Sequence, residues 1–293
     1  LYRDLEFKSW LDELLSPGLF AENAPEAPVT SAPELNTVTI TDQNVLDEWI
    51  GRLEGASLFA FDTETTSLNY MQAEIVGVSF AVDAGEAAYV PLAHINPGLE
   101  GQLDRESVLE QLRPLLESDA VKKVGQHLKY DANVLANHGI TLRGIAHDTM
   151  LESYVLDAVG SRHDMGSLAL KYLGQRVISF EEVAGKGAKQ ITFDHVPIEQ
   201  AAEYAAEDAD VTLRLHETLQ PKLEAEPKLR EVYEGLELPL VPVLSKIERN
   251  GAYVSVDRLR QQSSEIATRL AELETQACDL AGQPFNLASP KQL

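Results

Sequence analysis

An apolar run that ends in two carboxylates is the feature of this sequence that most restricts its fold. Residues 58–61 read Leu-Phe-Ala-Phe, which is typical of a buried strand, and Asp62 and Glu64 follow. Side chains alternate between the faces of a strand, so these carboxylates share one face. Two like charges at a buried position are costly unless a cation offsets them. The pair therefore predicts a site for Mg²⁺ or Mn²⁺, which prefer oxygen ligands, although a strand running into a polar turn has the same pattern.

Two further acidic positions follow. Asp131 lies in the first turn of a helix that we predict over residues 129–138, where an Asp also complements the helix dipole. Tyr204 and Asp208 are four residues apart in a predicted helix over residues 198–219, so both project from one face. A Tyr hydroxyl beside a carboxylate can orient a water molecule. A half-exposed Tyr on an acidic helix is the structural alternative.

Composition limits the class of protein. The 293 residues are 44% hydrophobic and 24% charged, which is ordinary for a soluble globular protein. The net charge of −23 argues against nucleic acid, unless metal ions supply the positive charge at a phosphodiester. The single cysteine, Cys278, excludes an internal disulfide, and no apolar run approaches a membrane span. We therefore expect a cytoplasmic location and no membrane partner. Because the chain begins with Leu1, we expect a fragment.

Three segments are expected along the chain. Residues 1–36 suit a short amphipathic helix and a mobile, proline-rich linker. Residues 37–226 have the patterns of an α/β domain with a mixed sheet flanked by helices. Residues 227–293 are helical in pattern and suit the start of a second, truncated domain.

The expected elements follow from periodicity and from turn signals. Strands are predicted at residues 37–40, 58–62, 74–82, 87–91 and 122–125, the middle three as an antiparallel meander. Helices are predicted at residues 42–53, 105–118, 129–138, 146–158, 167–172, 198–219, 229–250 and 255–281. We expect Pro239 and Pro242 to interrupt the helix over 229–250.

Along the chain, the order is Asp-x-Glu on a strand, Asp at the start of a helix and Tyr-x-x-x-Asp on a later helix. This order resembles the DEDD exonuclease superfamily, in the subclass with Tyr in the last motif. The resemblance covers about residues 37–220. Three stretches are similar to the proofreading exonuclease domain of the family A DNA polymerases: residues 147–154, 162–165 and 185–187. Three later stretches resemble the start of the polymerase domain in that family: residues 239–244, 247–251 and 289–293. The resemblance implies a ribonuclease H-like fold and hydrolysis of 3′-terminal nucleotides from DNA.

The resemblance also implies the cofactors. Two divalent ions about 4 Å apart, Mg²⁺ or Mn²⁺ with Zn²⁺ as an alternative at one position, would clamp the scissile phosphate. Asp62 would bridge both ions, with Glu64 and Asp208 on one of them and Asp131 on the other. Tyr204, helped by Glu64, would orient the attacking water.

The resemblance implies substrate contacts as well. Leu68 and Phe180 match positions that pack against terminal bases, with core packing as an equal alternative. Arg162 lies in a matching stretch and is a further candidate. The family usually has Asn where this chain has His127, whose imidazole is bulkier and can titrate near neutral pH. We expect activity to survive this change, and a structural histidine is the alternative. The implied partners are a single-stranded or frayed 3′ end of DNA and the remainder of the polymerase domain.

Two other functions remain open. An RNA-processing exonuclease would share the catalytic motifs, and a module that binds nucleic-acid ends or is purely structural would lack catalysis. We expect no nucleotide incorporation by this chain, because it ends before the polymerase carboxylates could appear.

Overall fold

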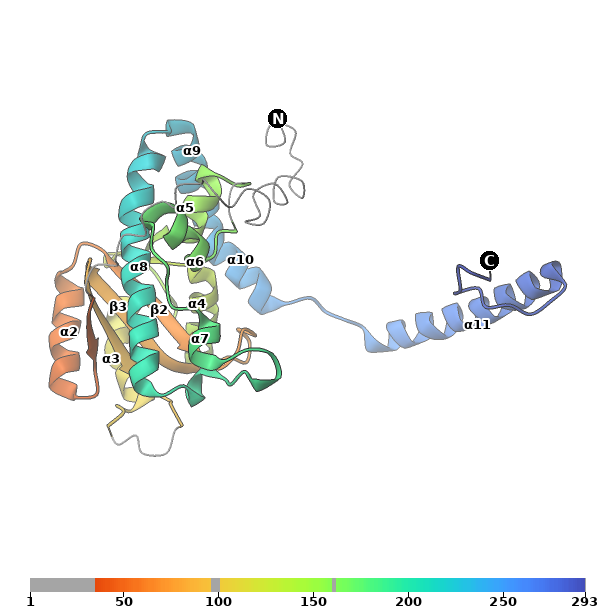
Figure 1. Ribbon diagram of the computed structural model, residues 1–293, viewed down its shortest axis with the longest axis horizontal. Helices are drawn as coiled ribbons and strands as arrows, with labels where there is room; N and C mark the ends of the chain where they lie inside the picture. The colour runs from red at the N-terminus through yellow and green to blue at the C-terminus, as the bar shows by residue number, and fades with distance from the viewer. Residues whose placement is uncertain (1–34, 96–100, 160–161, 293) are drawn as a thin grey trace, which may run out of the picture. The chain divides into compact units, whose positions relative to one another are not determined.

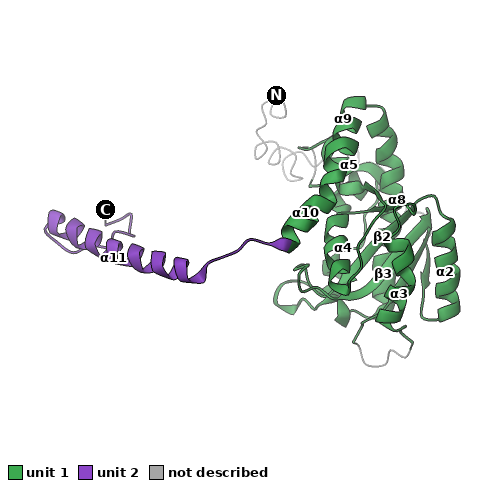
Figure 2. Ribbon diagram, turned by 180° about the vertical axis from the view of Figure 1, so that it is seen from behind, with its two compact units in different colours: residues 1–249 green, residues 250–293 purple. Residues whose placement is uncertain are grey.

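The computed structural model describes residues 35–95, 101–159 and 162–292 (Figure 1). The predicted N-terminal helix and nearly all of the predicted linker lie outside these residues. The chain divides into two compact units, residues 1–249 and residues 250–293 (Figure 2). The domain boundary expected at residue 226 stays a prediction, and residues 227–249 pack within the first unit.

A six-stranded mixed sheet forms the centre of the first unit, in the order β1-β4-β3-β2-β5-β6. The strands are β1 (Asn36–Thr39), β2 (Phe59–Thr65), β3 (Ile75–Asp83), β4 (Glu86–Pro91), β5 (Lys123–Gly125) and β6 (Ile145–Asp148). Strands β2, β3 and β4 pair antiparallel, which confirms the predicted meander. The outer pairs β1–β4, β2–β5 and β5–β6 are parallel.

The two faces of β2 carry side chains of different size, and this decides which helices cover them. Phe59 and Phe61 are buried in the larger core cluster, with residues of α2 (Gln43–Gly55), α3 (Arg105–Leu116) and α4 (Leu128–Leu135). Ala60 faces the opposite way, against the alanines of α8 (Ile198–Glu224), which crosses the sheet in Figure 1. Small side chains on both partners let α8 lie close to the sheet.

Ten further elements complete the described part of the first unit. They are η1 (Ala136–His138), α5 (Thr149–Leu156), α6 (Met165–Leu168), η2 (Ala169–Leu173), α7 (Phe180–Ala184), η3 (Gly187–Lys189), η4 (Phe193–His195), α9 (Pro227–Val232), η5 (Tyr233–Glu237) and α10 (Leu238–Asn250). The predicted strands β1 to β5 and the helices α2, α3, α4 and α8 are all present, with ends shifted by a few residues.

Two local predictions are wrong. Residues 146–148 belong to β6 and not to a helix, because a four-residue edge strand is too short to show alternation in sequence. The helix α10 also continues through Pro239 and Pro242. The π-helix η5 directly precedes it, and its wider turn relieves the clash between the Pro239 ring and the carbonyl of Gly235, four residues earlier.

The second unit contains one long helix, α11 (Val256–Ala281), close to the predicted range. The Ser255 side chain accepts a hydrogen bond from the Arg258 backbone N–H and caps its start. Its apolar side chains, among them Leu259, Ile266 and Leu270, are exposed. Along the described ranges, no helix combines the length and apolar character needed to cross a bilayer.

Candidate active site

A cavity of about 770 Å³ lies where β2 ends, between α4, α7 and α8. All five predicted catalytic residues line it: Asp62, Glu64, Asp131, Tyr204 and Asp208. Three of the four predicted substrate contacts line it as well: Leu68, His127 and Phe180. These residues are up to 146 positions apart in sequence, so the tertiary structure alone brings them together.

The alternation of β2 aims two carboxylates at α8. Asp62 and Glu64 continue the face of Ala60, which packs against Ala206 and Ala209 of α8. Tyr204 and Asp208 project from the same helix and line the cavity with them. The small alanines thus bring the Tyr-x-x-x-Asp motif next to the Asp-x-Glu motif.

Asp131 reaches the site from the other side of β2. Its Oδ1 atom accepts hydrogen bonds from the Thr63 backbone N–H at 3.1 Å and from the Thr63 hydroxyl at 2.6 Å. Thr63 points to the α4 face because it alternates with its two acidic neighbours. Both Thr63 and Asp131 are buried. The residue between the two strand carboxylates therefore orients the third.

Burial raises the pKa of all four carboxylates, and the charge of Asp62 adds to the rise in the other three. Burial raises the pKa of Asp62 to about 6, opposed by the backbone N–H of Thr63. Burial raises the pKa of Glu64 well above its usual range, and the charges of Asp62, Asp208 and Asp131 add to the effect. Burial and the Asp62 charge do the same to Asp131 and Asp208. The site therefore disfavours four negative charges unless cations join them.

The chemistry of this site fits divalent cations. The Glu64 Oε1 atom is buried without a hydrogen-bond partner, and none of the described residues that line the cavity is Lys or Arg. An oxygen-only ligand set suits Mg²⁺ or Mn²⁺. Among the described residues, only a different group, His147, Glu152 and His216, brings three ligand atoms within 4.8 Å of one another. The pocket carboxylates would have to draw closer around an ion.

Tyr204 joins the carboxylates to an aromatic wall. Its hydroxyl donates a hydrogen bond to Asp208, and burial followed by the Asp208 charge raises its pKa, so it stays protonated. Its ring lies 5.8 Å from Phe193 and 6.5 Å from Phe180, measured between centroids. Phe180 and Phe193 stack at 6.3 Å, and Phe180 remains 38% exposed. This wall offers flat apolar surface beside the acidic groups.

Leu68 stands at the mouth of the cavity on a loop that Tyr130 holds. The Leu68 side chain is 93% exposed, so it has no packing role in the core. The Tyr130 hydroxyl donates to the Ser67 carbonyl at 2.6 Å and is also bonded to the Thr65 hydroxyl. Tyr130 comes from α4, one residue before Asp131, and ties the loop to that helix.

His127 begins α4 in a left-handed conformation, with φ 67° and ψ 43°. Asn and His tolerate this region better than most residues. The His127 and Leu128 backbone N–H groups donate to the Asp148 carboxylate at 3.1 and 2.8 Å. Burial and the Lys129 charge lower the pKa of the His127 imidazole, so it is neutral at pH 7. The pH response expected at His127 stays a prediction.

Arg162 is the predicted substrate residue that the structure does not bring to the site. It is exposed and does not line the cavity. Its substrate role stays a prediction.

Sequence reasoning missed Thr63, Tyr130, Phe193 and Asp148. One sequence signal could have identified Tyr130, because it directly precedes Asp131, a carboxylate of the predicted site. Thr63, Phe193 and Asp148 act through contacts that no local pattern records.

Comparisons with known proteins agree with this geometry. A family model described as 3′-5′ exonuclease matches residues 37–224. DNA polymerase I of Pseudomonas aeruginosa is 60% identical over 295 residues, which cover 100% of this chain and 32% of the relative. DNA polymerase I of Rhizobium leguminosarum is 45% identical, with 98% of this chain and 30% of the relative covered. The chain thus spans about a third of the curated relatives that it matches.

Solved structures share the fold. The POL domain of Pol1 from M. smegmatis, in complex with DNA primer-template and dNTP, aligns with a TM-score of 0.69 and 22% identity, covering 87% of this chain and 39% of that one. Brucella melitensis NrnC with bound Mg²⁺ aligns with a TM-score of 0.51 and 20% identity, covering 75% and 95%. The expected α/β exonuclease fold is confirmed. Because the family model matches more than half of its residues, this chain belongs to the 3′-5′ exonuclease family.

Proposed function

We propose that this chain hydrolyses nucleotides one at a time from the 3′ end of DNA, in a proofreading role. One observation carries the proposal: four carboxylates and a tyrosine from β2, α4 and α8 line one cavity, and no Lys or Arg is among its described lining residues. Only bound cations can make such a site attractive to a phosphodiester.

The carboxylates would divide between two ion positions. Asp62, central in β2, would be shared, with Glu64 and Asp208 toward α8 and Asp131 toward α4. When bound, two divalent ions supply positive charge to the scissile phosphate and leaving oxygen and make water a stronger nucleophile. Thr63 keeps Asp131 facing the cavity through two hydrogen bonds.

Tyr204 and Glu64 would orient the attacking water. The Tyr204 hydroxyl is already fixed by its hydrogen bond to Asp208 and remains protonated, because its pKa is raised. The free Glu64 Oε1 atom can accept a hydrogen from the same water. No side chain need form a covalent intermediate.

The apolar surfaces would receive the terminal bases. Leu68 projects from the loop on one side, and Phe180 forms the exposed part of the aromatic wall. Stacking on apolar and aromatic side chains tolerates every base, as removal of any mispaired nucleotide requires. His127, at the rim, would contact the terminal nucleotide through its neutral imidazole.

A labelled oligonucleotide assay tests the activity. We expect the chain to shorten a 5′-labelled single-stranded DNA from its 3′ end with Mg²⁺ or Mn²⁺, and neither the EDTA sample nor Asp62→Ala to do so. A matched RNA strand distinguishes an RNA-processing enzyme by faster cleavage. If the chain cleaves neither strand with either metal, the exonuclease proposal is wrong.

The relatives also suggest the larger context. We propose that residues 37–226 form the exonuclease domain of a family A DNA polymerase and that residues 227–293 begin its polymerase domain. A chromosomal DNA substrate would place this protein in the bacterial cytoplasm. Primer extension with dNTPs by a polypeptide that also carries the remaining polymerase region would support this assignment.

A further inference from the structure

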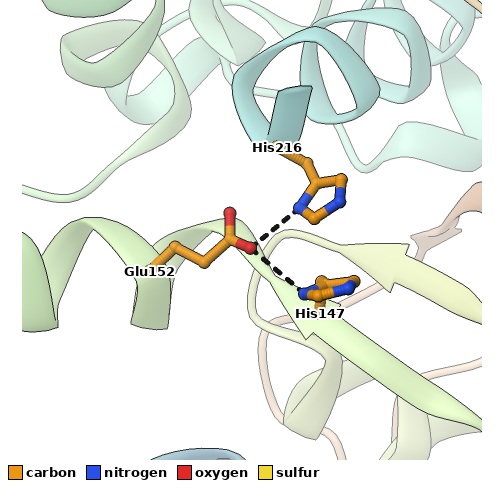
Figure 3. A group of neighbouring side chains, drawn as sticks. All are labelled: His147, Glu152 and His216. Carbon is orange, nitrogen blue, oxygen red and sulfur yellow. Dashed lines mark hydrogen bonds and ion pairs between the residues drawn. The ribbon is translucent and has the colours of Figure 1, made fainter. Parts of the chain in front are cut away.

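A second group of ligand-type side chains lies outside the catalytic cavity. His147 is at the end of β6, Glu152 is in α5 and His216 is in α8 (Figure 3). Figure 3 shows both imidazoles turned toward the Glu152 carboxylate. The His216 Nδ1 atom lies 2.8 Å from Glu152 Oε1, and the His147 Nδ1 atom lies 3.3 Å from the same oxygen. None of the three lines the cavity.

Some buried polar atoms of this cluster make no hydrogen bond. Glu152 is 0% exposed, and its ion-pair partners among the described residues are the two imidazoles. Glu152 Oε2 and His147 Nδ1 are buried without a hydrogen-bond partner. The Tyr233 hydroxyl accepts from the Asp148 N–H at 3.0 Å and also donates to the Glu152 carboxylate, whose charge adds to the effect of burial in raising the pKa of Tyr233. Buried atoms of this kind require an explanation, and a bound ion is one.

We propose that His147, Glu152 and His216 bind a Zn²⁺ ion at a structural site separate from the catalytic cavity. Two imidazole nitrogens and one carboxylate oxygen form a ligand set that Zn²⁺ accepts, whereas Mg²⁺ prefers oxygen alone. Ligand atoms about 2.0–2.1 Å from a tetrahedral Zn²⁺ lie about 3.3 Å apart. The separations of 2.8 and 3.3 Å, with all three atoms within 4.8 Å, are close to that requirement. A water would complete the coordination.

The location assigns a stabilising role to the ion. It would join β6, α5 and α8, which already meet through side-chain packing and through the contacts of His216 and His147 with Glu152. His147 is followed by Asp148, whose carboxylate holds the start of α4. The His147 ring also stacks on Tyr233 of η5, with centroids 6.4 Å apart and planes at 10°. A cation at this point would hold the end of β6 beneath the helix that carries Asp131.

The test must separate this site from the catalytic one. The complete 293-residue chain carrying Asp62→Asn and Asp208→Asn has a disabled carboxylate site and serves as the background. After chelator treatment and dialysis, we expect it to bind one Zn²⁺ and to give the visible absorption of four-coordinate Co²⁺. Zn²⁺ at about 100 times its Kd should raise Tm by roughly 5 °C.

Two variants remove ligands while keeping neighbouring contacts. His147→Phe retains the ring on Tyr233, and His216→Gln retains a donor for Glu152. Each should weaken Zn²⁺ binding at least 100-fold and abolish the Co²⁺ absorption, and circular dichroism with the metal-free Tm reports whether each folds. His195→Gln, which lies outside the cluster, should bind as the background does. Equal Zn²⁺ binding by the background and a folded ligand variant, or no Zn²⁺ binding by the background, would overturn the proposal.

Discussion

The Oδ1 atom of Asp131 accepts two hydrogen bonds from a single residue, the backbone N–H and the hydroxyl of Thr63. Thr63 separates the two acidic residues of β2, so one strand carries two carboxylates on one face and orients a third from the other. Burial and the Asp62 charge raise the pKa of Asp131, and the Thr63 bonds oppose that rise. Thr63 therefore keeps Asp131 both in place and able to ionise.

Replacing Thr63 by Val should reduce exonuclease activity about 10-fold, because the hydroxyl bond is lost while the shape is kept. The loss of a hydrogen bond to a buried carboxylate costs about 1–3 kcal/mol. The rising limb of the pH–activity profile should move to higher pH, since the pKa of Asp131 rises further. Thr63→Ser, which keeps the hydroxyl, is the control. Identical profiles for the Val and Ser variants would show that the bond has no role.

Replacing Tyr204 by Phe should lower kcat roughly 100-fold and leave KM nearly unchanged. The ring still packs against Phe193 and Phe180, so only the hydroxyl that orients water is removed. Steady-state kinetics on single-stranded DNA, together with Tm, separates the chemical effect from a packing effect. A raised KM at normal kcat would instead assign Tyr204 to substrate binding.

Asp208 and Asp210 occupy one helix but should respond in opposite ways to Asn substitution. Asp208→Asn should raise the Tm of the metal-free protein, because burial and the Asp62 charge penalise its carboxylate, and should reduce activity more than about 100-fold. Asp210→Asn should lower stability by about 1–2 kcal/mol. Its carboxylate pairs with Arg214 at 3.0 Å and accepts from the Gly85 N–H at 2.7 Å. Thermal melts in EDTA measure both, and destabilisation by Asp208→Asn would contradict the electrostatic account.

The stability of the metal-free protein should fall as pH rises through about 6. The folded-state pKa of Asp62 is raised from 3.8 to about 6, so its contribution to stability is fully present below pH 3.8 and is lost through pH 6. The pKa values of Glu64, Asp131 and Asp208 are raised in the same direction. Because cations bind the ionised carboxylates, Mg²⁺ should raise Tm more at pH 8 than at pH 5. Equal Mg²⁺ effects at the two pH values would argue against these ligands.

Replacing Leu68 by Ala should lower kcat/KM on DNA by roughly 10- to 100-fold, because a base that covers a Leu side chain buries apolar surface worth about 1.5–3 kcal/mol. Tm should not change, because this side chain is 93% exposed. Leu170→Ala, at a residue that is 59% exposed and does not line the cavity, is the matched control. A lower Tm of the Leu68→Ala variant would show that Leu68 packs against the protein and not against substrate.

The central elements could be predicted because their patterns are local. The alternation in β2 and the four-residue spacing in α8 place Asp62 with Glu64 and Tyr204 with Asp208 before any tertiary contact is known. β6 could not be predicted in this way. It is four residues long, and its pairing with β5 makes it a strand.

The amino-acid sequence by itself determined the strand meander and the long helices. It also determined that Asp62 lies beside Glu64 and Tyr204 beside Asp208, because each of these features depends on neighbours along the chain. Only the tertiary structure decided that Asp131 bonds to Thr63, 68 residues away, that Phe193 completes an aromatic wall, and that His147 meets Glu152 and His216. The physical reason is packing. Ala60 of β2 and the alanine face of α8 set how closely these elements approach, and the distances between distant side chains follow from that approach.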